Sequence, residues 1–138
     1  MDDKEQPIET NEVNDEIEAA LKDKRGLVAH QKRLVFCLSS GAIELLENYF
    51  KRKGVLKQGV KLNHQWFKKK KENVKKILSE KITSSLDSLE KIDKIIDCIY
   101  AIESKRNELI YGKKATEELL KDLLGQYFEL KKEVENGT

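Results

Sequence analysis

The residues best suited to chemistry lie in the segment 105–114, which reads Lys-Arg-Asn-Glu-Leu-Ile-Tyr-Gly-Lys-Lys. Arg106 supplies a guanidinium, Asn107 an amide and Tyr111 a phenol, just before a glycine. A guanidinium can hold a phosphate through two parallel hydrogen bonds, so the segment is a candidate site for a phosphate or a nucleotide. Additional positive charge comes from three neighbouring lysines: Lys105, Lys113 and Lys114.

Whether these groups meet depends on how the helix that carries them ends. Positions 106 and 111 point about 140° apart on a regular helix, because each residue turns the chain by 360°/3.6. They converge only if the helix ends or unwinds near Tyr111, and Gly112 favours such an end. The alternative is that Arg106 pairs with a neighbouring acid such as Glu103, while Tyr111 packs under the following loop.

A second candidate is the basic block of residues 51–76, which holds eleven basic residues and one acid, Glu72. Such a one-sided segment attracts anions, and nucleic acid is the usual partner. Within the block, Trp66 and Phe67 either stack on bases or belong to the core. The lysines expected to contact nucleic acid are Lys68, Lys69, Lys70 and Lys71. The first 20 residues hold eight acids and one lysine. We hypothesise that the acidic tail, residues 1–13, folds back on the block when no ligand is bound.

The sequence offers no other catalytic arrangement. It has no glycine-rich phosphate loop and no His-Glu-x-x-His string, and two histidines, His30 and His64, are too few for most metal sites. We therefore expect no metal and no cofactor. Cys37 and Cys98 stand in apolar segments without a partner at ligand spacing, which indicates buried free thiols in a reducing cytoplasm.

The segments that must position these residues have a helical pattern. Charged residues make up 38% of the chain, and its only proline is Pro7, which favours helices over strands. Apolar residues recur at every third or fourth position in four segments: 28–53, 63–81, 84–111 and 116–135. In the third segment, Ser84 and Asp87 approximate a capping box. The predicted fold is all-α, an antiparallel four-helix bundle.

The predicted bundle is a single domain of residues 14–138, with a weak helix over 14–24, and residues 1–13 are expected to form a disordered acidic tail. No apolar run approaches the roughly 20 residues of a membrane span. The first residues are polar and acidic, which predicts that there is no signal peptide. We therefore expect a cytoplasmic protein that does not contact membranes.

Arg106 and Asn107, followed by an aromatic residue at the end of the penultimate long helix, resemble the motif of the HEPN family of RNA-linked helical domains. Segments 32–36 and 42–46 are similar to the first helix of such domains, and the resemblance covers residues 28–135. It implies a homodimer with the motif at its interface, where Arg106 contacts a phosphate and Asn107 orients it. Members of the family act as metal-independent ribonucleases in toxin–antitoxin or defence systems, or as inactive partners of a nucleotidyltransferase.

The sequence departs from the family motif at one position, because Tyr111 stands where the family has histidine. An unperturbed tyrosine, with a pKa of about 10, is a poor general base at neutral pH. Neither His30 nor His64 stands at the family's catalytic position. The leading expectation is an RNA- or nucleotide-binding module with weakened catalysis. The alternatives are an active endoribonuclease that uses Arg106 and Tyr111, and a helical scaffold without a nucleic-acid role.

Overall fold

The protein is described by a computed structural model that covers residues 8–136, and this part of the chain is all-helical as predicted. It forms five α-helices: α1 (Ile8–Lys22), α2 (Gln31–Arg52), α3 (Lys71–Lys81), α4 (Ile92–Tyr111) and α5 (Glu117–Asn136). Three short 3₁₀ helices lie between them: η1 (Leu27–His30), η2 (His64–Lys68) and η3 (Leu86–Ser88). Within the described residues there is no strand, only an isolated bridge between Leu56 and Ile82. None of these helices is both long and apolar enough to cross a bilayer.

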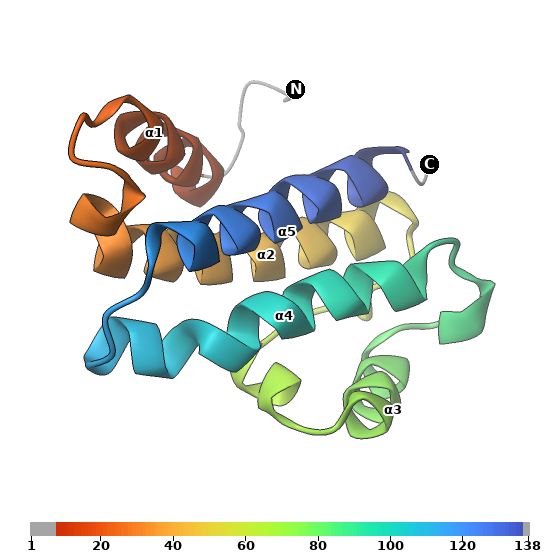
Figure 1. The fold of residues 1–138 in the computed structure, drawn as a ribbon. Coiled ribbons are helices and arrows are strands. Elements are labelled where there is room, and N and C mark those ends of the chain that lie inside the picture. The colour runs from red at the N-terminus through yellow and green to blue at the C-terminus, as the bar shows by residue number, and fades with distance from the viewer. Residues whose placement is uncertain (1–7, 137–138) are drawn as a thin grey trace.

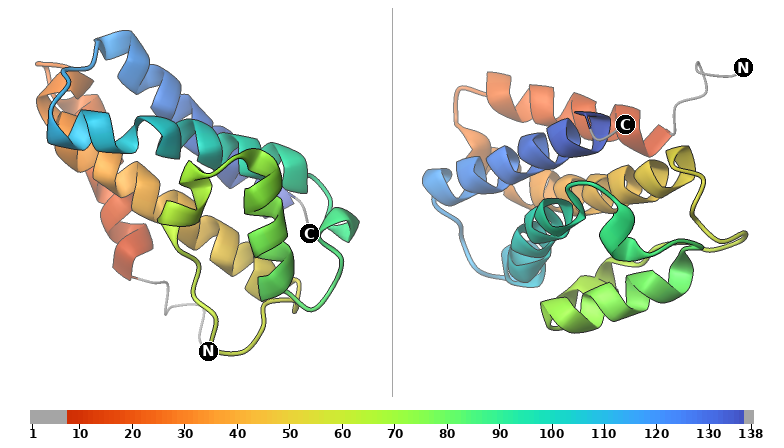
Figure 2. Two further views of the ribbon diagram at one scale, coloured as in Figure 1. Left: turned by 90° about the horizontal axis from the view of Figure 1, so that it is seen from below. Right: turned by 90° about the vertical axis from the view of Figure 1, so that its right-hand side faces the viewer.

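The core lies where α2, α4 and α5 pack against one another. In Figure 1, α2 and α5 run in the same direction and α4 runs opposite to both. The predicted apolar stripes face this core, since Leu34, Leu38 and Ala42 of α2 are fully buried, as are Ile99 of α4 and Leu130 of α5. Figure 2 shows α3 outside this core, where it runs crosswise to α4.

Helix α1 begins at Ile8, so residues 8–13 belong to a helix rather than to the predicted disordered tail, and residues 1–7 lie outside the described part. Val13, Ile17 and Ala20 are buried at helical spacing. They pack α1 on α2, on the opposite side of the molecule from α3 (Figure 1). The weak helix predicted over 14–24 therefore corresponds to the second half of α1, and only the start of α1 was missed. Tertiary packing of a short apolar stripe stabilises this helix more than local propensity does.

The predicted helix over 84–111 begins eight residues later than expected, at Ile92. Ser84 and Asp87 therefore form no capping box, and the segment before α4 consists of η3 and a turn. Leu86 and Leu89 are nevertheless buried, so the apolar spacing continues through a segment that is not α-helical. This spacing led to the prediction of a helix that starts too early. Lys91, the residue before α4, has a left-handed backbone conformation with φ of 65°. A right-handed α-helix cannot continue through this residue, so α4 starts after it.

The predicted helix over 63–81 is divided into η2 and α3. The Asn63 side chain caps η2 by accepting a hydrogen bond from the Gln65 backbone N–H at 2.8 Å. Lys69 and Lys70 are then extended, and α3 starts at Lys71. The break falls at the gap in the apolar stripe, where lysines stand in place of apolar residues. It allows η2 and α3 to pack independently.

One side chain of α2 fixes the end of α4. Gln31 Nε2 donates to the carbonyl oxygens of Leu109 at 2.9 Å and of Lys113 at 2.7 Å. Its Oε1 accepts from the backbone N–H of Ala115 at 3.0 Å. These three bonds satisfy backbone groups that the helix end leaves open. They hold the last turns of α4, which include Arg106, in a fixed relation to α2.

Candidate functional site

Arg106 is held in place by three neighbours on the side of α4 that faces α2. Its Nε donates to Ser39 Oγ at 3.0 Å, and its Nη1 donates to Asn107 Oδ1 at 3.0 Å. The guanidinium carbon lies 5.7 Å from the centre of the Phe36 ring, which is a cation–π distance. None of these contacts engages Nη2. The guanidinium is therefore oriented in advance and keeps hydrogen-bonding capacity for a ligand.

A buried carboxylate links Arg106 to a histidine. Glu103 is only 2% exposed, and Ser39 Oγ donates a short hydrogen bond to its Oε2. Glu103 Oε1 lies 3.2 Å from His64 Nδ1. An ionised carboxylate only accepts hydrogen bonds, so this pair places the proton on Nδ1 and leaves Nε2 with a lone pair when the ring is neutral. Arg106 thus reaches Glu103 through Ser39 and makes no direct ion pair with it, unlike the pairing considered from the sequence.

His64 and Arg106 line the same pocket, which has a volume of about 330 Å³. Its remaining lining residues come from α2 and from the loop before η2: Phe36, Ser39, Ser40, Ile43, Leu62 and Asn63. We call it the Arg106 pocket. The loop is anchored because Glu47 Oε2 accepts from the Leu62 backbone N–H at 2.8 Å. The pocket thus combines a guanidinium, an imidazole, two hydroxyls and an amide, which are groups that can bind a phosphate.

Sequence reasoning missed His64 as a neighbour of Arg106. The two residues are 42 positions apart, and no local motif connects them. The only signal was that His64 is one of two histidines, directly after a residue suited to capping a helix. The contact arises because η2 packs on α4, which is a tertiary feature.

Tyr111 does not join this site. Helix α4 stays regular through Tyr111, so the side chains at 106 and 111 keep their angular separation, and Tyr111 is 77% exposed. It also does not pack under the following loop. Neither arrangement considered from the sequence, convergence of Tyr111 with Arg106 or packing of Tyr111 under the loop, is therefore present. Among the neighbouring lysines, Lys105 lies 4.0 Å from Glu108, and Lys113 and Lys114 are exposed beyond the end of α4.

The basic block does not form one face. Lys71 pairs with Asp97 at 2.7 Å and Lys75 with Asp93 at 2.8 Å, so these lysines hold α3 against α4. The hydrogen bond from Lys75 lowers the pKa of the Asp93 carboxyl, as expected for an ion pair. Lys68, Lys69 and Lys70 are exposed around the break between η2 and α3.

The two aromatic residues of the block belong to the core rather than to an open stacking surface. Phe67 is fully buried, and Trp66 is partly buried against the core. The Nζ atom of Lys81 covers the Trp66 ring at 5.3 Å from its centre. Trp66 therefore has little open ring surface for a base.

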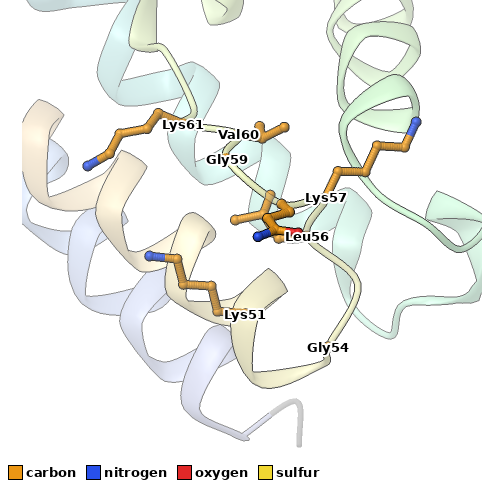
Figure 3. Close-up of a pocket in the computed structure, with 8 residues that line it drawn as sticks. Lys51, Gly54, Leu56, Lys57, Gly59, Val60 and Lys61 are labelled. Carbon is orange, nitrogen blue, oxygen red and sulfur yellow. The ribbon is translucent and has the colours of Figure 1, made fainter.

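The loop after α2 forms a hollow of about 410 Å³ that includes Lys51, Lys57 and Lys61. In Figure 3, Lys57 extends to the side opposite Lys51 and Lys61. Lys51 Nζ lies 3.8 Å from Glu47 Oε1, so part of its charge is balanced. Because the three ammonium groups do not converge, this loop contributes a diffuse positive field rather than a defined anion site.

The cysteines and remaining acids offer no further reactive centre. Both thiols are free, and burial raises the pKa of Cys98 to about 11, so it is a thiol and not a thiolate at neutral pH. Within residues 8–136, no group of three His, Cys, Asp or Glu side chains is arranged to hold a metal ion. The other histidine, His30, lies between Glu16 at 2.8 Å and Asp23 at 2.9 Å, where it holds α1 to η1.

Comparison of the chain with protein-family models, with curated proteins and with solved structures gave no match. The site must therefore be interpreted from its own geometry.

Proposed function

We propose that the chain is a HEPN-like helical module that binds RNA or a nucleotide through Arg106. The observation that carries this proposal is the guanidinium of Arg106, fixed by Phe36, Ser39 and Asn107 at a pocket that also contains His64. A guanidinium held in this way loses little entropy when it binds a phosphate. Its position near the end of α4, the penultimate long helix, is where the resemblance expects the phosphate contact.

The charges around the pocket favour an anionic ligand. Glu103 is buried, and its two carboxylate oxygens already contact Ser39 and His64. Lys68 and Lys105 are exposed on neighbouring elements and add positive potential. The resemblance to the HEPN family also leads us to propose that the chain forms a homodimer and binds a nucleotidyltransferase partner. Light scattering of the purified chain tests the homodimer, and co-purification with a candidate nucleotidyltransferase tests the partner.

The binding proposal is tested by fluorescence anisotropy with a labelled single-stranded RNA. We expect Arg106→Ala to weaken binding by about 10- to 100-fold, since a hydrogen bond to a charged group contributes about 1.5–3 kcal/mol. Lys121→Ala, an exposed charge removal on α5, is the matched control and should change affinity little. Circular dichroism shows whether each variant is folded. Equal RNA affinity of wild type and a folded Arg106→Ala variant would refute the proposal.

A second candidate function is metal-independent RNA cleavage, and the observation that favours it is the Glu103–His64 pair. In this reaction His64 Nε2 would take the proton of a ribose 2′-OH while O2′ attacks phosphorus. The P–O5′ bond would break, and O5′ would take a proton from water, leaving a 2′,3′-cyclic phosphate. Arg106 would bind the phosphate oxygens. This assignment gives His64 the role that the sequence alone offered to Tyr111.

Cleavage of a mixed RNA pool in EDTA separates the two candidates. The binding module predicts no cleavage by well-folded wild type. The endoribonuclease predicts cleavage that both Arg106→Ala and His64→Gln abolish and that Tyr111→Phe leaves unchanged. Cleavage that survives in His64→Gln would exclude His64 as the general base.

A further inference from the structure

A second hollow lies beside Arg106, between η2 and α4. Its volume is about 290 Å³, and its lining includes Phe67, Lys68, Tyr100, Ser104, Asn107 and Glu108. It is joined to the Arg106 pocket by one hydrogen bond, because Arg106 Nη1 donates to Asn107 Oδ1 at 3.0 Å. Asn107, which lines this hollow, therefore contacts the guanidinium that lines the Arg106 pocket.

The hollow has the chemistry of a nucleobase site. Phe67 is fully buried beneath it, whereas Tyr100, which also lines the hollow, is 39% exposed. An exposed aromatic ring can stack on a base. The bond from Arg106 occupies Asn107 Oδ1 and leaves the amide hydrogens of Asn107 as donors. Two carboxylates also line the hollow: the buried Glu103, and Glu108, whose Oε2 lies 4.0 Å from Lys105 Nζ. Amide and carboxylate groups of this kind hydrogen-bond to base edges.

We propose that this hollow binds the base of the nucleotide whose phosphate contacts Arg106, with the base stacked on Tyr100. The inference rests on the proposed function and makes it more specific. The ligand is single-stranded RNA, because bases within a duplex are stacked and paired and cannot turn into such a hollow. Lys68, at the rim of the hollow, meets the backbone of the neighbouring nucleotide.

The dependence of RNA affinity on salt concentration distinguishes a stacking contact from a contact between charges. Loss of one base stack weakens binding by about tenfold and leaves the dependence of affinity on salt unchanged. Loss of one phosphate contact also lowers the slope of log affinity against log salt, by about one. Affinities of a fluorescent single-stranded RNA should therefore be measured at several salt concentrations.

The variants compared are Tyr100→Ala, Tyr100→Phe and Arg106→Ala, with Phe128→Ala as control for removal of an exposed aromatic ring on α5. We expect Tyr100→Ala to bind about tenfold more weakly with an unchanged salt slope. Tyr100→Phe, which keeps the ring, and Phe128→Ala should bind like wild type. A second measurement uses wild-type protein and an abasic form of the same RNA, which should also bind about tenfold more weakly. This measurement does not depend on how any variant folds.

The outcomes separate this inference from the proposed function. If wild type binds RNA and Arg106→Ala weakens binding, but abasic RNA binds wild type as tightly as intact RNA, the base site is overturned and the binding function stands. If wild type binds no RNA, both proposals fail together. If abasic RNA and Tyr100→Ala each weaken binding at constant salt slope, the hollow is a base site.

Discussion

Two glycines in helix interiors allow a sharp test of how α1, α2 and α5 pack. An added Cβ atom at Gly41 of α2 would lie 3.0 Å from Tyr127 of α5 and 3.1 Å from Val13 of α1. An added Cβ at Gly125 of α5 would meet nothing within 4 Å. The substitution to alanine is chemically identical at both positions, so the difference in stability measures packing alone.

The expected magnitudes follow from two opposing effects. Alanine is favoured over glycine in a helix interior by about 1 kcal/mol, so Gly125→Ala should raise the free energy of unfolding by about that amount. Gly41→Ala gains the same free energy from the helix preference of alanine, but overpacking against buried Tyr127 and Val13 costs about 1–3 kcal/mol. The net effect should lie between no change and a loss of about 2 kcal/mol.

Guanidinium chloride unfolding followed by far-UV circular dichroism measures both variants, with equal m-values as the check that they unfold alike. Val13→Ala makes room for the new methyl group but removes buried apolar surface itself. Gly41→Ala should therefore cost less in the Val13→Ala background than in wild type, which a double-mutant cycle measures. If Gly41→Ala stabilises the protein as much as Gly125→Ala, then α1 and Tyr127 do not pack against α2 at this point, and the reasoning is refuted.

Three further predictions concern other contacts. Gln31→Ala removes three hydrogen bonds at the end of α4 and should lower the free energy of unfolding by roughly 1–3 kcal/mol in chemical denaturation. A variant as stable as wild type would show that these bonds do not hold the end of α4 to α2. Hydrogen bonds from Arg25 and then His30 lower the pKa of Asp23 below its ordinary 3.8, so its contribution to stability is present above about pH 4 and is lost as the pH falls further. Urea titrations of Asp23→Asn should therefore show a weaker loss of stability below pH 4, and an unchanged profile would exclude this contribution. The buried Cys98 thiol, with its pKa raised to about 11, should react with a thiol reagent only when the protein unfolds, and rapid labelling of native protein would contradict its burial.

The sequence predicted the existence of the long helices better than their ends. The stripes of α2 and α5 were recognisable because buried residues repeat at helical spacing over five turns. The start of α4 was placed too early because Leu86 and Leu89 keep that spacing through a turn. Apolar spacing reports which residues are buried, and it does not by itself report the backbone conformation between them.

Only those residues of the candidate site that are close together in the sequence could be predicted. Arg106 and Asn107 could be singled out because they are adjacent and resemble a known motif. Glu103 lies one turn before Arg106 on the same helix and was considered from the sequence as its partner. Ser39 and His64 come from α2 and η2, which meet α4 only in the folded chain. Tyr111 could have joined the site only if the helix unwound before it, whereas α4 continues through Tyr111.

The contacts of the buried Glu103 with Ser39 and His64 determine when the Arg106 pocket can form during synthesis of the chain. Ser39 and Glu103 are 64 positions apart, and His64 and Glu103 are 39 apart. When α2 leaves the ribosome, α4 and α5, which pack on its buried face, have not yet been synthesised. The Arg106 pocket therefore cannot exist on a nascent chain that ends before α4. A ligand that needs this pocket should distinguish completed molecules from partly synthesised ones and should slow the unfolding of the completed form.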